Sequence, residues 1–239
     1  LKRVRTQYSL HVLCSDSISE TSITKLKHRK ILFQRLNEHV PVYDNINKEA
    51  GYDHWNRTFD KLYVWTLTQF DKVVYLDSDM QVIANIDYLF DCPHMSAVRA
   101  DAFNEPGLDK LNSGLMVIEP NISEFKGLCA ILESGELHLK NMGDQDVIRA
   151  YYSDWGAKEE LTLPFGLNVF YSEVTRGIIS RRDIEPVSVI HYIGHNKPWM
   201  ISPRAILRRS RNNFLGKHLV RYAFALYFHY PLCIINKSN

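Results

Sequence analysis

Two carboxylates that follow an apolar segment are the residues with the clearest capacity for chemistry. The segment Lys72–Leu76 is followed at once by Asp77, Ser78 and Asp79. Residues two positions apart in an extended chain project from the same face. Two neighbouring carboxylates repel each other unless a cation or a proton lies between them. This pattern fits a divalent-metal site that holds a phosphorylated substrate, and it fits an ordinary polar turn equally well.

The elements that must position this pair alternate between apolar strands and amphipathic helices. Such alternation is typical of an α/β domain with a mostly parallel central sheet flanked by helices. Ligands bind α/β sheets at the carboxyl ends of the strands, which is where the two aspartates lie. We expect strands at Tyr8–Cys14, Val40–Tyr43, Lys72–Leu76, Ser96–Ala100, Leu115–Ile118 and Pro186–Tyr192, and helices at Ile23–Asn37 and Arg57–Phe70 and after Asn121 and Gly143.

The totals describe an ordinary globular chain. It has 239 residues, a net charge of +2 and 45% hydrophobic residues, so we expect one sizeable catalytic domain over residues 1–203. The small net charge gives no reason to expect nucleic acid as a partner. The four cysteines are isolated in the sequence and predict no zinc knuckle and no disulfide framework: Cys14, Cys92, Cys129 and Cys233.

The two ends of the chain raise separate expectations. The sequence begins at Leu1 without an initiator methionine, which predicts an upstream segment and leaves both cytoplasm and Golgi lumen open as locations. Residues 204–239 form a basic and aromatic tail. Its apolar part, Leu219–Ile235, is interpreted as a helix that packs back on the domain, or as a weak contact with a membrane surface.

Further motifs follow the two aspartates in a fixed order. They are Asn112-Ser113-Gly114, Gly143-Asp144-Gln145 and His191-x-x-Gly194-x-x-Lys197-Pro198-Trp199. With this set in this order, residues 58–199 resemble the glycogenin-like branch of the family 8 glycosyltransferases. The resemblance implies a GT-A fold and a retaining transfer of a hexose from a UDP-sugar to a hydroxyl acceptor, which could be a glycan, polyol, lipid or protein.

The resemblance also implies a manganese site made by Asp77, Asp79 and His191. The chemistry of the residues agrees, because carboxylates suit Mg²⁺ or Mn²⁺ and an imidazole favours Mn²⁺. Such an ion neutralises the diphosphate and makes UDP a better leaving group. Without the motif around it, His191 would be interpreted as a core histidine at a strand end.

Other positions match donor-binding residues of the family. The resemblance assigns Lys61, Ser78, Gly194 and Lys197 to the UDP-sugar, and Lys61 would otherwise be the polar side of an amphipathic helix. It places Asn112 and Gln145 on the donor sugar and Asp144 beside it. Asp144 either orients a sugar hydroxyl, stabilises an oxocarbenium-like centre or only caps its helix. Retention through a covalent intermediate and retention by same-face attack both stay open.

Two departures from the family keep other functions open. The chain lacks the first strand–helix unit that builds part of the nucleotide pocket in family members, and Asn141 stands where an aspartate is common. The alternative is therefore a catalytically impaired nucleotide-sugar-binding protein or fragment. Another metal-dependent phosphate chemistry, such as nucleotidyl transfer, would be expected to bring a glycine-rich basic loop that the sequence lacks. Tyr171 lies where self-glucosylated relatives carry their acceptor tyrosine, and the oligomeric state stays open.

Overall fold

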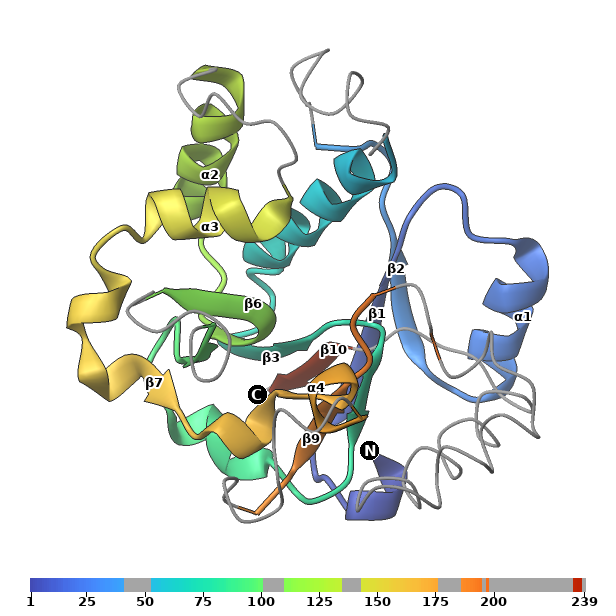
Figure 1. The fold of residues 1–239 in the computed structure, drawn as a ribbon. Coiled ribbons are helices and arrows are strands. Elements are labelled where there is room, and N and C mark those ends of the chain that lie inside the picture. The colour runs from blue at the N-terminus through green and yellow to red at the C-terminus, as the bar shows by residue number, and fades with distance from the viewer. Residues whose placement is uncertain are drawn as a thin grey trace.

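A mixed sheet of seven strands forms the centre of the molecule (Figure 1). The computed structural model describes residues 1–40, 53–100, 110–134, 143–175, 186–194 and 197, and the backbone of 234–237. The strand order is β2-β1-β10-β3-β6-β5-β7. The strands of this sheet are β1 (Ser9–Cys14), β2 (Leu32–Arg35), β3 (Lys72–Leu76), β5 (Ala97–Arg99), β6 (Leu111–Ile118), β7 (Thr162–Leu163) and β10 (Ile234–Lys237).

Most strands of this sheet point the same way, as the sequence predicts. β2, β1, β3, β5 and β7 share one direction, and β10 and β6 run opposite to them. Because the two reversed strands lie inside the sheet, four of its six hydrogen-bonded pairings are nevertheless antiparallel. A second sheet has the order β4-β9-β8, and its strands are β4 (Met80–Val82), β8 (Val169–Phe170) and β9 (Val189–His191).

The helices complete the domain on the faces of the sheets. The α-helices are α1 (Glu20–His28), α2 (Ile122–Ser134), α3 (Asp144–Tyr151) and α4 (Tyr171–Thr175), and the longer 3-10 segments are η3 (Asp53–Thr66) and η4 (Asp87–Asp91). Figure 1 shows α2, α3 and η3 grouped together, with α1 beside the β1–β2 end of the sheet. None of the helices in the described part of the chain is long and apolar enough to cross a membrane.

β3 and β6 are buried on both sides and separate two layers of core. Val73 of β3 packs into the layer with Phe59, Leu62 and Trp65 of η3, while the next residue, Val74, packs into the layer on the other side. All eight residues of β6 are buried. This explains the apolar runs Val73–Leu76 of β3 and Leu115–Ile118 of β6, and the pairing holds the carboxyl end of β3 against β6.

The helix expected over Ile23–Asn37 is wrong in its second half. α1 ends at His28, and Lys30 has a left-handed φ of 55° that breaks the helical path. Leu32–Arg35 then pairs in parallel with β1 as strand β2. Sheet pairing therefore overrides a helical composition, which is a common failure of local propensity.

Two further expectations are only partly covered by the structure. The strand expected at Val40–Tyr43 is not seen at Val40, and the rest of it lies outside the described residues, as does Asn141. Of the predicted tail, the structure describes only Ile234–Lys237, which form β10 between β1 and β3. The end of the expected helix at Ile235 is thus a strand.

Candidate active site

The two aspartates lie in a tight turn that connects β3 to β4. The backbone N–H of Asp77 still donates to the carbonyl of Gly114 at 2.8 Å, and the N–H of Met80 donates back to the carbonyl of Asp77 at 3.1 Å. The chain from Asp77 to Asp79 is therefore a turn, and the extended geometry that the sequence suggested is incorrect. Both carboxylates still face the same point in space, since each has an oxygen atom within 4 Å of Nε2 of His191.

His191 reaches this turn from a distant part of the chain. β9 pairs antiparallel with β4, and the register sets His191 opposite Met80. Its Nε2 atom lies 3.1 Å from Oδ1 of Asp79 and 3.8 Å from Oδ2 of Asp77. One ligand atom from each of the three residues lies within 4.8 Å of the others, a spacing that could hold a metal ion. The structure therefore brings the three predicted ligands together.

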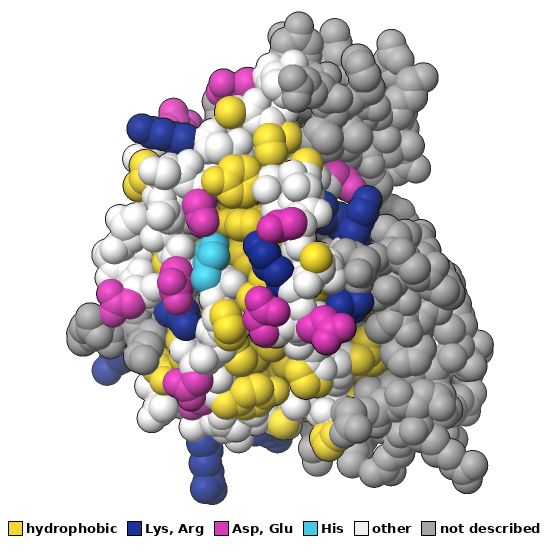
Figure 2. Space-filling model, turned by 90° about the vertical axis from the view of Figure 1, so that its left-hand side faces the viewer, with side chains coloured by type: hydrophobic (Ala, Val, Ile, Leu, Met, Phe, Trp, Pro, Cys, Tyr) yellow, Lys and Arg dark blue, Asp and Glu magenta, His cyan; other side chains and the backbone are white. Residues whose placement is uncertain are grey.

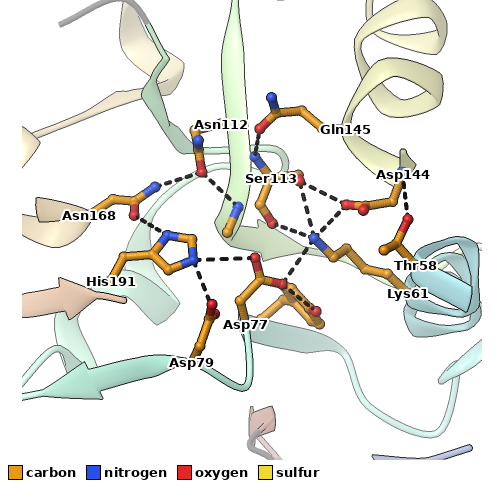
Figure 3. A network of polar contacts seen from close by, with 12 residues as sticks. Thr58, Lys61, Asp77, Asp79, Asn112, Ser113, Asp144, Gln145, Asn168 and His191 are labelled. Atoms are coloured by element: carbon orange, nitrogen blue, oxygen red, sulfur yellow. Dashed lines mark hydrogen bonds and ion pairs between the residues drawn. The ribbon is translucent and has the colours of Figure 1, made fainter. Parts of the chain in front are cut away.

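Lys61 of η3 is buried at the centre of a polar network (Figure 3). Its Nζ atom lies 3.0 Å from Oδ1 of Asp77 and 2.5 Å from Oδ2 of Asp144. It also donates to the hydroxyl and the carbonyl of Ser113, at 3.1 and 3.3 Å. Burial by itself would lower the pKa of Lys61, but the charges of Asp144 and Asp77 outweigh burial and raise it above its ordinary value. The ammonium group is therefore held charged between two carboxylates.

The two aspartates of the turn differ in their electrostatics. Burial raises the pKa of Asp77 above its ordinary value, with the charge of Lys61 as the main opposing influence. Burial acts in the same direction on Asp79, but contacts with His191 and Lys197 lower the pKa of Asp79 well below its usual range. The carboxylate of Asp79 therefore stays ionised at neutral pH, as a metal ligand must.

The sugar-binding candidates come from β6 and the start of α3. The side-chain oxygen of Gln145 accepts the backbone N–H of Ser113 at 3.0 Å, and Oδ2 of Asp144 accepts the Ser113 hydroxyl at 2.9 Å. The backbone N–H of Asp144 donates to the hydroxyl of Thr58 at 3.2 Å, and its side chain is engaged by Lys61. The helix begins at this residue, but its carboxylate points into the network and does not cap the helix (Figure 3).

The remaining donor-binding candidates lie around the same turn. Nζ of Lys197 contacts the carboxylate of Asp79 and donates to the carbonyl of Tyr192 at 2.7 Å. Gly194 is exposed and has a φ of 79°, a left-handed conformation that favours glycine. Ser78 is exposed at the tip of the turn. Their roles toward a donor remain predictions.

Several residues of the site carry no signal that was recognised in the sequence. Asn168 accepts a hydrogen bond from Nδ1 of His191 at 2.9 Å, and Tyr75 donates to Oδ1 of Asp77 at 2.8 Å. Ser113 bridges Lys61, Asp144 and Gln145, and its place inside the Asn-Ser-Gly motif could have marked it. Asn168 follows the loop that begins at Pro164, and no local pattern singles it out.

The fold and this site define a glycosyltransferase of the GT-A class. The chain superposes on the crystal structure of the apo-form glycosyltransferase GlyE of Streptococcus pneumoniae with a TM-score of 0.55 and 19% identity, covering 93% of this chain and 57% of that one. A second solved structure, the apo form of the bifunctional glycosyltransferase WbbM, gives a TM-score of 0.52 at 15% identity over 91% of this chain and 52% of that one. At such identities the comparison shows the fold.

Within that class the chain belongs to glycosyltransferase family 8. The family model, described as "Glycosyl transferase family 8", matches residues 3–201, so the likeness extends further toward the N-terminus than the motifs alone suggest. UDP-glucuronate:xylan alpha-glucuronosyltransferase 2 of Arabidopsis thaliana is 31% identical over 208 residues, which is 84% of this chain and 32% of that protein.

Two other relatives have names that differ from that of the glucuronosyltransferase. Human glycogenin-1 is 29% identical over 209 residues, which is 83% of this chain and 56% of glycogenin-1. Galactinol synthase 6 of Arabidopsis thaliana is 27% identical over an alignment of 237 residues, gaps included, that covers 83% of this chain and 66% of the synthase. The chain thus spans about a third of the glucuronosyltransferase and just over half of glycogenin-1.

Proposed function

We propose that this chain is the catalytic domain of a metal-dependent, retaining glycosyltransferase that moves a hexose from a UDP-sugar to a hydroxyl acceptor. The observation that carries the proposal is the convergence of Asp77, Asp79 and His191 beside the polar network of Lys61. Family membership supports the reaction class. Two of the relatives are named for different products, a glucuronosyl-xylan and galactinol, so the sugar and the acceptor are separate questions.

The residues of the turn fit a divalent ion. Two carboxylates and one imidazole offer hard oxygen ligands and a borderline nitrogen ligand, a combination that favours Mn²⁺ and accepts Mg²⁺. Nδ1 of His191 contacts Asn168, which leaves Nε2 directed at Asp77 and Asp79. When bound, such an ion neutralises the diphosphate and so eases the departure of UDP.

The protein residues then have distinct tasks in the transfer. Lys197 and the backbone at Gly194 would bind the diphosphate, and a positive charge there stabilises the charge that develops on the leaving group. Asn112, Asp144 and Gln145 would orient the hexose. In the overall reaction the bond between the anomeric carbon and the diphosphate oxygen breaks, a bond from the acceptor oxygen to that carbon forms on the same face, and the hydroxyl proton leaves with UDP; direct same-face attack and a covalent intermediate both give this result.

Lys61 has a different task from the one the resemblance implies. Its ammonium group contacts two carboxylates and both oxygens of Ser113, so its three N–H bonds are already directed at protein partners. We therefore assign Lys61 to holding Asp77 and Asp144 in place as charged groups, Asp77 as a metal ligand and Asp144 beside the sugar.

A calorimetric titration of UDP with and without Mn²⁺ tests the proposal. Asp79→Ala is expected to abolish Mn²⁺-dependent binding while the circular dichroism spectrum is retained, because the variant loses a metal ligand and keeps the core. Asp91→Ala removes an exposed aspartate at the end of η4 and serves as the matched control. If the affinity of the wild-type chain for UDP is the same with and without Mn²⁺, the proposed metal-dependent reaction is refuted.

Donor hydrolysis over a panel of UDP-sugars separates the transferase from the alternative. Turnover of UDP-glucose, UDP-galactose or UDP-glucuronate supports the transferase and identifies its sugar. Mn²⁺-dependent binding without turnover of any of them supports a nucleotide-sugar-binding protein that has lost catalysis.

A further inference from the structure

A chain of buried side-chain contacts connects the metal-ligand candidates to the sugar-binding candidates. Nδ1 of His191 lies 2.9 Å from Oδ1 of Asn168, and Nδ2 of Asn168 donates to Oδ1 of Asn112 at 2.7 Å. Asn112 Oδ1 also accepts the backbone N–H of Gly114 at 2.9 Å. Asn168 is 1% exposed, His191 5% and Asn112 9%. Figure 3 shows these groups in a continuous line from β6 to β9.

The backbone of Gly114 sets the direction of every bond in this line. A backbone N–H can only donate, so the Asn112 atom facing it must be the oxygen. Asn168 must then present its nitrogen to that oxygen, which leaves its own oxygen for His191. An amide oxygen can only accept, so the proton of the last bond must be on Nδ1 of His191.

We propose that Asn168 is a positioning residue that sets His191 for metal binding and Asn112 for sugar binding at the same time. With Nδ1 protonated, Nε2 is directed at Asp77 and Asp79, and this arrangement is favourable when a metal ion lies between these groups or when Nε2 also carries a proton. With its oxygen engaged twice, Asn112 has only its amide nitrogen left to offer as a donor to a sugar oxygen. The inference rests on the proposed function for the identity of the ligands, Mn²⁺ and a sugar. The direction of the hydrogen bonds does not depend on the proposed function.

The position of the imidazole ring is fixed from the other side by β6. A Cβ atom at Gly114 would lie 2.8 Å from Cε1 of His191 and 2.8 Å from the terminal methyl of Met80. The backbone at Gly114 therefore packs directly against the ring while its N–H orients Asn112. The backbone at Gly114 confines the imidazole ring on this side, and the hydrogen bond to Asn168 determines which ring nitrogen faces the carboxylates.

Metal affinity in three variants tests this role. Asn168→Leu removes both bonds, and loss of such an orienting partner lowers metal affinity by about 10- to 100-fold. Asn168→Asp keeps an oxygen for Nδ1 of His191 and is expected to bind Mn²⁺ far more tightly than Asn168→Leu. The control is Asn121→Asp, the same change at an exposed position that caps α2. Mn²⁺ affinity is measured by calorimetry or from the electron paramagnetic resonance of free Mn²⁺.

The outcomes of this comparison are distinct. If Asn168 served only to stabilise the fold, Asn168→Asp would bind Mn²⁺ more weakly than Asn168→Leu. The reason is that a buried carboxylate next to an amide oxygen costs more folding free energy than a leucine of similar size. Equal affinity of Asn168→Leu and the wild type overturns the inference. If the wild-type chain itself fails to bind Mn²⁺, the proposed function fails, and the hydrogen-bond order is decided by spectroscopy.

Two-bond ¹H–¹⁵N correlation spectra of the histidine-labelled, metal-free protein supply that second readout. We expect the His191 ring to carry a proton on Nδ1, whether or not Nε2 is also protonated. Asn112→Asp, which keeps the acceptor oxygen, is expected to leave this signature unchanged, whereas Asn168→Leu is expected to lose it. A wild-type ring with a bare Nδ1 and a protonated Nε2 would overturn the assignment.

Discussion

Lys61 is the residue on which the electrostatics of the site depend. Its side chain is 8% exposed, and it neutralises carboxylates that come from two elements distant in the sequence, Asp77 after β3 and Asp144 of α3. A buried charge that loses its partner is far more costly than a surface charge, because water cannot replace the missing interaction. Lys61 therefore contributes to folding as well as to the geometry of the polar network around Asp77 and Asp144.

We predict that Lys61→Met lowers the free energy of unfolding by about 3–5 kcal/mol, since it leaves two carboxylates without their cation. Urea denaturation at neutral pH measures the change. Lys126→Met, at an exposed position of α2, is expected to stay within about 0.5 kcal/mol of the wild type. A Lys61 variant as stable as this control would show that the buried contacts are not formed in solution.

At the scale of elements, the pairing of β4 with β9 and the close approach of β6 decide the geometry of the site. The register that sets Met80 opposite His191 is fixed by side chains that alternate between faces, so a shift of one residue would turn the imidazole away. The other close approach is the backbone of Gly114 against the same imidazole.

We predict that Gly114→Ala weakens Mn²⁺ binding by at least about tenfold, because the added methyl displaces the ring of His191 from the two aspartates. Calorimetry of Mn²⁺ and UDP measures this loss, with Gly143→Ala as the control. A Cβ atom at Gly143 has its nearest neighbour, the hydroxyl of Thr58, at 3.5 Å, an ordinary contact distance. Equal Mn²⁺ affinity in the two variants would contradict the packing argument.

Another contact between elements is sensitive to pH. His39, after β2, lies with Nδ1 2.7 Å from Oδ2 of Asp60 in η3 and with Nε2 3.1 Å from Oδ1 of Asp16 after β1. The hydrogen bond to Asp60 is the main cause that raises the pKa of His39 above its ordinary value, and the charges of both aspartates add to it. The side chain of His39 is 38% exposed, which limits the strength of the interaction.

We predict that this contact stabilises the domain most at acidic pH. Because the pKa of His39 is raised in the folded state, the contact contributes fully to the free energy of unfolding below the ordinary histidine pKa of about 6.5. This contribution is lost as the pH rises through the higher pKa of the folded state. His39→Gln should therefore lose up to about 1 kcal/mol near pH 6 and less near pH 9 in urea titrations. A loss that grows as the pH rises would contradict the assignment.

At the scale of the whole molecule, the site exists only when the domain is folded. Its residues come from η3, the β3–β4 turn, β6, α3, the position just before β8, and β9, which are spread along most of the described chain. Among the described residues on the face shown in Figure 2, the acidic and basic side chains are interspersed with apolar ones.

A ligand that binds only the folded chain must stabilise it. At a Mn²⁺–UDP concentration 100 times the dissociation constant, we predict about 2.7 kcal/mol of added stability, seen as a higher melting temperature that EDTA reverses. The same additions should leave the melting temperature of Asp79→Ala unchanged. An equal rise in both proteins would indicate binding outside the Asp77–Asp79 turn.

The sequence by itself determined the α/β class, the buried strand Lys72–Leu76 and the identity of the three metal-ligand candidates. These follow from local apolar patterns and from short motifs that match a family. It mispredicted the region of β2, because composition alone does not reveal that Leu32–Arg35 pairs with β1. It also gave no indication of Asn168 or of the carboxylate pair around Lys61. Those contacts join residues 16 to 83 positions apart, and only tertiary packing, which removes water from buried polar groups, decides which of them meet.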